Sequence, residues 1–576
     1  MRGRKKDFVA CVHCRQMKLA CDGPRNFPAA CSRCTKAGRL CSVDPGFRRV
    51  KKREKFKEVE RELREIKQSL RTGDEHDQDV EGASHTDTST LTALPSSILP
   101  QPEALETAPT GRTIGGIHLL PNLQQDLITE FYEDYHPFCP ILPHPRAFLG
   151  YAELCPLLLY IVLVTALRGK PEHNELFLAL VDTVRTMSYE LMRPEFVSLQ
   201  TMQAFLLLCY WPLPYSKRID DPTHSFIALA THIGYSLGMH RAPRYAKDFD
   251  NKLSVDGNME VCRRITWVVC FITNVSATSQ LGLPTSIRLD RGLLEILAAK
   301  PTWLPETLFY QLHVSRQAFN MNLTFEDFEH FLKDNPADSS PIIRAFDMEM
   351  RSLESRFSLS WSPGDYIFFL GCRMMLYTIA LTMVSDTLEE SNVVSTTIES
   401  PCYWVVQTYI TAISTIRTAV SIQDTIFNSP VRMHKLLINA ICYLVLLKCS
   451  RFQDLVDNST LSNGIRQGWE VLRGLSITPN DFTTRACSIC ERLSRYSDDL
   501  KPEERTKGLL VLKSRMGANI AFSTALRARE WSRQTQGDTS STEINDGEEP
   551  ADAFSIEDLS LFADINWEDL FPVLGT

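Results

Sequence analysis

Hydrophobic residues recur at intervals of three and four through most of the chain, from about Ile117 to Trp531. This spacing places apolar side chains on one face of a helix, whereas the alternating pattern of half-buried strands is rare there. Clear examples lie at Phe205 to Trp211, Phe226 to Met239 and Ile265 to Ile272. The pattern predicts a mostly α fold, in which residues 117–531 form one large all-helical domain.

The longest apolar run, from Leu154 to Leu167, spans about 14 residues and contains Pro156. A helix needs roughly 20 apolar residues to cross a bilayer, so this run predicts a buried core helix and no membrane partner. The start of the chain has basic residues but no apolar run behind them, which is not the pattern of a secretory signal peptide. We therefore expect the protein to be kept inside the cell.

A shorter periodic segment lies at residues 54–71. Its apolar residues recur at alternating three- and four-residue steps, as in the a and d positions of a coiled coil: Phe56, Val59, Leu63, Ile66 and Leu70. In that register Lys55 faces Glu60, and Glu62 faces Lys67, across a parallel dimer, so both pairs attract. The segment predicts a homodimer. A single amphipathic helix is the alternative, because barely two heptads are marginal in water.

Two segments lack the periodicity needed to bury a core. Residues 72–116 are rich in Asp, Glu, Ser, Thr and Pro and are predicted to be a disordered linker. Residues 532–576 are predicted to be an acidic tail, with 11 acidic residues and no basic one from Gln534 onward. Acidic and hydrophobic residues interleave there, as in activation segments that bind a coactivator groove, or in a last helix docked on the domain. The candidate activation residues are Phe562, Trp567, Leu570 and Phe571.

Composition separates the amino-terminal segment from the rest. The whole chain has 44% hydrophobic and 23% charged residues and a formal net charge of −8, as in a globular protein. Residues 1–71, however, carry 21 Lys or Arg against 8 Asp or Glu. Such a basic segment is typical of a module that binds DNA, because its cations release counterions from the phosphates. Its basic runs also resemble nuclear import signals, so we expect a nuclear protein.

Six cysteines of this basic segment follow the pattern C-x2-C-x6-C, then nine residues, then C-x2-C-x6-C again. They are Cys11, Cys14, Cys21, Cys31, Cys34 and Cys41. Two tetrahedral zinc ions need eight thiolate positions, which six cysteines fill only if two equivalent ones bridge both metals. Three disulfides are the alternative, which an intracellular protein disfavours. We therefore predict two zinc ions that supply most of the folding free energy, with short helices at Arg15 to Leu19 and Thr35 to Ala37.

The strings ACVHCRQMKLACD and CSRCTKAGRLC resemble the fungal Zn2Cys6 binuclear-cluster transcription factors. This resemblance implies a zinc-dependent regulator of RNA polymerase II transcription that reads CGG triplets in the major groove of double-stranded DNA. It assigns Cys11 and Cys31 as the bridging ligands and Lys18 as the donor to the triplet, whose guanines offer N7 and O6 as acceptors. Phosphate contacts are assigned to Arg15, Arg33 and Lys36, and for Lys36 a purely solvated side chain is the alternative.

The residues after the cluster extend the resemblance. Phe47-Arg48-Arg49 and the basic helix behind them look like the linker of the leucine-pathway-regulator branch, which reads everted CGG triplets as a dimer, and Arg48 and Arg49 join the candidate DNA contacts. Looser matches to the family's middle homology region lie at Phe131 to Leu142, Ala228 to Arg241 and Arg263 to Trp267. They imply a regulatory domain with a small-molecule effector pocket between its helices.

Catalytic and nucleotide-binding motifs of the common classes do not occur, so the chain is not predicted to be an enzyme. We interpret Cys487 and Cys490 as core residues, and His136, His232 and His240 as residues that satisfy local hydrogen bonds. The favoured function is a transcriptional activator. A repressor is the first alternative, and a reporter distinguishes the two. Two alternatives come from other classes of protein. An enzyme tethered to DNA by its cluster would require titratable residues that converge in a deep pocket, and a metal store would require exchangeable thiols.

Overall fold

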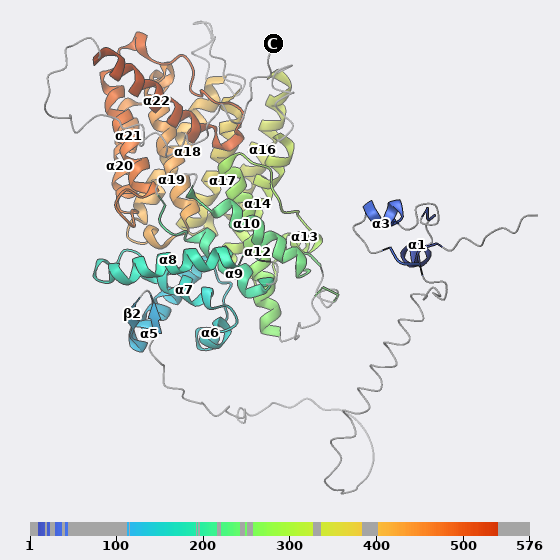
Figure 1. Ribbon diagram of the computed structural model, residues 1–576. Coiled ribbons are helices and arrows are strands. Elements are labelled where there is room, and N and C mark those ends of the chain that lie inside the picture. Colours follow the sequence, from blue (N-terminus) through green and yellow to red (C-terminus); the bar gives the residue numbers. More distant parts are fainter. Residues whose placement is uncertain are drawn as a thin grey trace, which may run out of the picture. The chain divides into compact units, whose positions relative to one another are not determined.

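The computed structural model of the chain divides into two compact units, Met1–Ala104 and Leu105–Thr576 (Figure 1). The structure describes residues 10–17, 20–22, 29–36, 41–43, 112–114, 116–191, 193, 196–215, 220–241, 248–249, 257–325, 336–382 and 401–539. In the smaller unit the described helices are α1 (Val12–Met17) and α3 (Ser32–Lys36).

The larger unit begins with an antiparallel hairpin of two short strands, β1 (Arg112–Ile114) and β2 (Ile117–Leu119). Gly116 lies in the turn with φ of 83°, a left-handed conformation that suits glycine because it has no Cβ. Strand β1 falls inside the segment predicted as a disordered linker to residue 116, so that prediction is wrong at its carboxyl end. Strands of three residues are too short to produce a recognisable alternating pattern.

Helices make up most of the rest of the described unit. The first are α5 (Pro121–Glu130), α6 (Pro145–Ala152), α7 (Pro156–Ala166), α8 (Asn174–Glu190), α9 (Leu199–Tyr210) and α10 (Thr223–Ser236). Next come α12 (Gly257–Leu281), α13 (Arg291–Ala298), α14 (Glu306–Phe325), α16 (Pro336–Phe357), α17 (Pro363–Leu381) and α18 (Pro401–Ser421). The last are α19 (Val431–Lys448), α20 (Asn458–Arg473), α21 (Phe482–Asp499) and α22 (Asn519–Thr539), with a short 3-10 turn, η11 (Met516–Ala518), before α22. The predicted mostly α fold is confirmed.

Two buried helices organise the packing. Helix α19 contacts α17, α18, α20, α21 and α22, and α12 contacts α9, α10 and α14 (Figure 1). The Tyr443 hydroxyl, fully buried in α19, donates a hydrogen bond to the Val405 carbonyl of α18 at 2.6 Å. The buried apolar side chains form one continuous cluster from Leu119 to Trp531. The described helices of the larger unit therefore share one hydrophobic core.

The apolar patterns found in the sequence lie where helices were expected. The three periodic segments fall largely within α9, α10 and α12, and the apolar run from Leu154 to Leu167 contains the buried helix α7. Helix α17 is long and apolar enough by composition to cross a membrane, but 83% of its apolar stretch is buried inside the protein, as in a core helix. Helix α22 continues to Thr539, past the predicted boundary at Trp531. Its polar last turns carry little apolar signal, which explains the early boundary.

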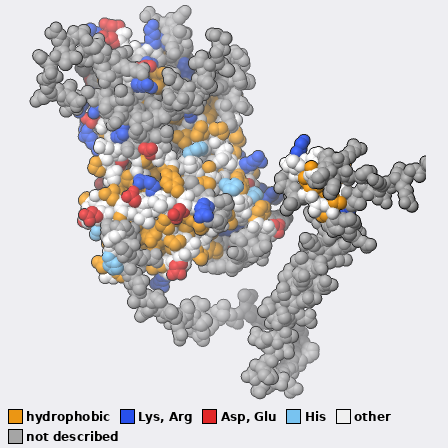
Figure 2. Space-filling view, in the orientation of Figure 1, with side chains coloured by type: hydrophobic (Ala, Val, Ile, Leu, Met, Phe, Trp, Pro, Cys, Tyr) orange, Lys and Arg blue, Asp and Glu red, His pale blue; other side chains and the backbone are white. Residues whose placement is uncertain are grey.

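The surface of the larger unit differs from the basic amino-terminal segment in its charge. On the face that Figure 2 shows, basic and acidic side chains of the described residues are interspersed among apolar and neutral ones. Interspersed charges of both signs are ordinary for a water-exposed helical domain. The candidate for a polyanion-binding surface is therefore the smaller unit, to which the 21 basic residues of residues 1–71 belong.

Candidate zinc cluster and DNA interface

Sulfur atoms cap the two short helices of the smaller unit. The Cys14 N–H donates to the Sγ of Cys11 at 3.4 Å, and the Cys34 N–H donates to the Sγ of Cys31 at 3.4 Å. These are the N-cap and N3 positions of each helix, where a Ser or Asp oxygen usually accepts this hydrogen bond. The first cysteine of each C-x2-C pair therefore starts a helix as well as supplying a thiol.

This capping corrects the predicted helix positions. Helices α1 and α3 begin at Val12 and Ser32, inside the C-x2-C pairs. The sequence pattern placed their starts at Arg15 and Thr35, which is wrong by three residues in each half. Cysteine has no strong helix-starting preference when it carries a free thiol on the surface, so propensity alone does not reveal the cap.

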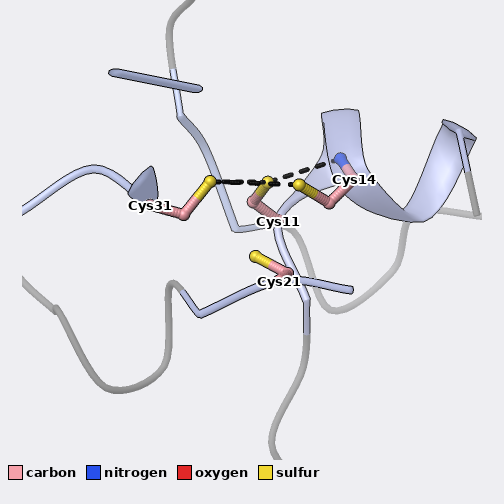
Figure 3. Close-up of side chains that lie close together, drawn as sticks. All are labelled: Cys11, Cys14, Cys21 and Cys31. Carbon is pink, nitrogen blue, oxygen red and sulfur yellow. Dashed lines mark hydrogen bonds between the residues drawn. The ribbon is translucent and has the colours of Figure 1, made fainter. Parts of the chain in front are cut away.

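The six cysteines come together as two groups of four that share two members. Cys11 and Cys31 belong to both groups, and the first group adds Cys14 and Cys21. The second group adds the two matching cysteines of the other half, and within each group all sulfur atoms lie within 4.8 Å of one another. Figure 3 shows the sulfurs of the first group gathered together, with Cys14 extending from α1. The arrangement has the same twofold character as the sequence repeat.

The sulfur–sulfur distances test whether zinc fits. The Sγ of Cys11 lies 3.9 Å from that of Cys31 and 3.8 Å from that of Cys34, and the Cys14 and Cys31 sulfurs are 3.9 Å apart. Four thiolates at about 2.3 Å from a tetrahedral zinc ion lie about 3.8 Å from one another. Sulfurs in a disulfide are only about 2.05 Å apart, and none of the chain's cysteines forms a disulfide. The donor set suits zinc, and the alternative of three disulfides is not observed.

Burial and backbone N–H groups act on these thiols in opposite directions. Burial raises the pKa of Cys11 and of Cys14 above the ordinary thiol value. The N–H of Cys34 lowers the pKa of Cys31 to about 6, because a hydrogen bond to sulfur favours the thiolate. Zinc ligation requires every thiol to be ionised, so metal binding expels protons from the buried thiols with raised pKa values. Zinc affinity therefore falls as the pH is lowered.

A carboxylate that the sequence analysis did not single out links the two halves of the cluster. Asp22, directly after the third cysteine, accepts a hydrogen bond from the Ser32 N–H through Oδ1 at 3.0 Å and another from the Ser32 hydroxyl. Ser32 is the first residue of α3, so the carboxylate also faces the positive end of that helix. The sequence holds one signal for this role, because the equivalent position after the last cysteine is Ser42 and the repeat is broken there.

We expect Asp22→Ala to weaken zinc binding about fivefold. Removing a carboxylate that caps a helix costs about 1 kcal/mol, and zinc binding and folding of so small a unit are coupled, so the cost appears in the zinc affinity. Competition with a chromophoric chelator measures it. Asp22→Asn keeps the Oδ1 acceptor, so it is the control and should lose much less zinc affinity. Equal zinc affinities for Asp22→Ala and the natural chain would contradict the proposed capping role of Asp22.

The candidate DNA contacts that the structure describes lie on both short helices. Arg33 and Lys36 of α3 are exposed, and are therefore available to a phosphate backbone. Arg15 of α1 is half-buried, and its Nη2 donates to the Ala10 carbonyl at 3.3 Å, so it is engaged within the unit. The remaining candidates lie outside the described residues: Lys18, Arg48 and Arg49.

Other residues singled out in the sequence have mixed outcomes. Cys490 is buried in α21 with its Sγ 3.8 Å from that of Cys442, so its interpretation as a core residue is confirmed, and Cys487 is buried as well. The histidine interpretation is supported at His136, which forms a hydrogen bond with the Leu142 backbone, although its Nε2 is buried without a partner, as is the Nδ1 of His240. The dimerisation and activation residues lie outside the described part of the chain: Phe56, Val59, Leu63, Ile66, Leu70, Phe562, Trp567, Leu570 and Phe571.

Comparison with known proteins agrees with the cluster geometry. Residues 9–49 match the fungal Zn(2)-Cys(6) binuclear cluster domain, which binds two zinc ions, and residues 128–311 match the fungal specific transcription factor domain. No solved structure matches the chain.

Two curated relatives are regulatory proteins by name. The chain is 26% identical over 355 residues to the transcriptional regulatory protein SEF1 of Candida albicans, an alignment that covers 50% of the chain and 38% of the relative. It is 24% identical over 363 residues to the regulatory protein LEU3 of Saccharomyces cerevisiae, covering 50% of the chain and 40% of the relative. The chain thus matches less than half the length of either relative. The chain therefore matches a fungal Zn(2)-Cys(6) binuclear cluster domain followed by a fungal specific transcription factor domain, and over about half of its length it is similar to regulatory proteins of fungi.

Proposed function

We propose that this chain is a zinc-dependent, sequence-specific regulator that reads CGG triplets in double-stranded DNA as a homodimer in the nucleus. The observation that supports it most is the pair of four-cysteine groups with two common members. In this proposal Cys11 and Cys31 bridge two zinc ions, and the other four cysteines each hold one. The metal then fixes α1 and α3 in a unit too small to bury a core of its own.

The DNA contacts follow from the placement of the basic residues. Lys18 comes directly after Met17, the last residue of α1, where a side chain can extend from the helix end into the major groove. The exposed Arg33 and Lys36 of α3 suit the phosphates, which position the protein without reading sequence. Lys18 is therefore proposed to specify the triplet, and the α3 pair to add affinity for any duplex.

This division of roles predicts two different losses. Lys18→Gln should lower affinity for a CGG duplex by about 10- to 100-fold and remove its preference over a scrambled duplex, because one base contact is worth roughly 1–3 kcal/mol. The double variant Arg33→Gln, Lys36→Gln should weaken binding to both duplexes equally and reduce the salt slope by about 2, one for each phosphate contact. Fluorescence anisotropy over a range of salt concentrations measures both. A double variant that changed the CGG preference, or a Lys18 variant that kept it, would contradict the assignment.

Dimerisation is assigned to residues 54–71, and regulation is assigned to the helical domain. The predicted bounds of that domain, 117 and 531, are moved to Arg112, where the hairpin begins, and to Thr539, where α22 ends. The rest of the predicted tail, residues 540–576, is proposed to bind a coactivator, which makes the protein an activator.

The tail assignment predicts a loss of activation without a loss of DNA binding. Deleting residues 550–576 should abolish activation of a CGG reporter and leave DNA affinity unchanged. A matched variant that replaces Phe562, Trp567, Leu570 and Phe571 by alanine keeps every acidic residue, and it should lose activation as well, because the aromatic and aliphatic groups make the groove contacts. Reporter output that stays the same or rises would favour a repressor.

A further inference from the structure

A cavity of about 350 Å³ lies where α10, α12 and α13 meet, and four arginines line it. They come from three separate elements: Arg241 just after α10, Arg263 and Arg264 on α12, and Arg291 at the start of α13. The carboxylates in the lining are Asp290 and Glu295. A volume of this size is typical of sites for small molecules.

Hydrogen bonds hold the walls of this cavity in place. The Trp267 indole N–H donates to Oδ2 of Asp290 at 2.7 Å, and Oδ1 of Asp290 accepts the Leu293 N–H at 3.1 Å and caps α13. A Cβ on Gly234 of α10 would lie 2.5 Å from the Trp267 ring, so the two helices are in close contact. Asp290 is thus engaged by donors of the protein itself, and the three walls are fixed before any ligand arrives.

One arginine of the cavity has a buried donor without an acceptor. The Arg263 side chain is 4% exposed, and its Nε donates to Oε2 of Glu260 at 2.9 Å, but its Nη1 has no hydrogen-bond partner. The same Glu260 lies 3.5 Å from the Nε of Arg264 through its other oxygen. A single carboxylate therefore serves two guanidinium groups, and a buried cationic N–H is left unsatisfied, which is costly without an anionic acceptor.

A histidine adds a second unsatisfied group. The Nδ1 of His240, which also lines the cavity, is buried without a partner, while its ring packs against Tyr235 and Phe249 at centroid distances of 5.2 and 5.6 Å. An imidazole N–H can donate to the same kind of oxygen as a guanidinium. One unpartnered nitrogen on α12 and another in the turn after α10 thus belong to residues that line the same cavity.

We infer that this cavity binds a small organic dianion, such as a dicarboxylate or a phosphate ester. Guanidinium groups bind carboxylate and phosphate oxygens with paired hydrogen bonds, and here they line one cavity from different elements, so one ligand could contact both α12 and α13. Glu295 does not neutralise this wall firmly, because its pair with Arg291 at 3.0 Å has side chains that are 63% and 91% exposed. The cavity lies within residues 128–311, so the ligand would act on the fungal specific transcription factor domain.

Isothermal titration of the full-length chain with succinate and with inorganic phosphate tests this inference, with acetate as the singly charged comparison. We expect saturable binding of at least one dianion, tighter than that of acetate, at physiological ionic strength. Arg291→Gln should weaken it about tenfold or more, since one charge-assisted contact is lost. The matched control is Arg466→Gln, which removes an arginine from another exposed pair, Arg466 with Glu470 at 2.8 Å, and should leave the affinity unchanged.

The remaining variants separate ligand binding from stability. Arg263→Gln should abolish binding, but Arg263 is buried, so the variant can also unfold, and its circular dichroism spectrum shows whether the helices persist. Arg241→Gln changes an exposed residue of the same cavity and therefore tests ligand binding without disturbing the core. A preference for succinate assigns a carboxylic acid, and a preference for phosphate assigns a phosphate ester. The inference is overturned if neither dianion binds saturably, or if Arg291→Gln, Arg241→Gln and Arg466→Gln bind with equal affinity.

Discussion

Cys11→Ser is expected to lose both zinc ions and all measurable preference for CGG. Cys11 belongs to both four-cysteine groups, so its replacement leaves each group with three thiolates. Structural zinc contributes on the order of 10 kcal/mol to the folding of such sites, and a unit of this size has no other source of stability. DNA binding should fall by about a thousandfold or more, to the level of nonspecific contact between basic residues and phosphates. Native mass spectrometry counts the metal, and a competition binding assay measures the DNA affinity.

Cys21→Ser is the matched variant, because Cys21 belongs to one group only. It should keep one zinc ion, bound by Cys11, Cys31 and the other two cysteines of the second group. Cys487→Ser, a buried thiol of α21 outside the cluster, should keep both ions and serves as the control for loss of a cysteine as such. Identical zinc contents for Cys11→Ser and Cys21→Ser would show that Cys11 does not bridge.

Gly282→Ala is expected to destabilise the larger unit by about 3 kcal/mol or more. Gly282 ends α12 with φ of 63°, and a Cβ there would lie 2.3 Å from the carbonyl oxygen of Arg515, which precedes η11. The left-handed conformation alone costs an L-residue roughly 1–2 kcal/mol, and overpacking against backbone typically adds 1–3 kcal/mol. Urea unfolding followed by circular dichroism measures the free energy of unfolding.

Gly116→Ala is the control for that prediction. Gly116 has φ of 83° in the β1–β2 turn, but a Cβ there would meet no atom within 4 Å. Gly116→Ala should lose only the roughly 1–2 kcal/mol of unfolding free energy that the left-handed conformation costs. The difference in unfolding free energy between the two variants therefore isolates the contact between α12 and the segment before α22. Equal losses would mean that this contact contributes nothing. A larger loss for Gly282→Ala would show that the domain matched over residues 128–311 depends on helices far beyond it in the sequence.

The zinc cluster could be predicted almost completely from spacing, because six thiols in a symmetric repeat leave few ways to build two tetrahedral sites. The first residues of α1 and α3 could not be predicted, because each helix is capped by a cysteine sulfur, and that sulfur takes up its capping position only in the folded cluster. Asp22 was missed for a related reason. Its hydrogen bonds to Ser32 cross between the two halves, and a pattern search within each half does not see them.

The helical fold could be predicted from apolar periodicity. The apolar run from Leu154 to Leu167, for example, predicted a buried helix, and the structure has α7 there. Short or polar elements such as β1 and the end of α22 carry too little periodic signal. The arginine-lined cavity shows a different limit. Arg263 is part of a segment that the sequence analysis matched only to the family's middle homology region, and only tertiary structure reveals that it lines one cavity with Arg241 and Arg291.

The most direct test of the proposed function is selection of DNA sites by the full-length chain from a randomised duplex library, with and without a zinc chelator, followed by sequencing. We predict enrichment of paired CGG triplets that disappears on chelation and returns when zinc is restored, and the spacing of the pairs reveals the geometry of the dimer. A zinc-loaded chain that enriches no sequence, or that enriches the same sequences after chelation, would contradict CGG recognition through the cysteine cluster.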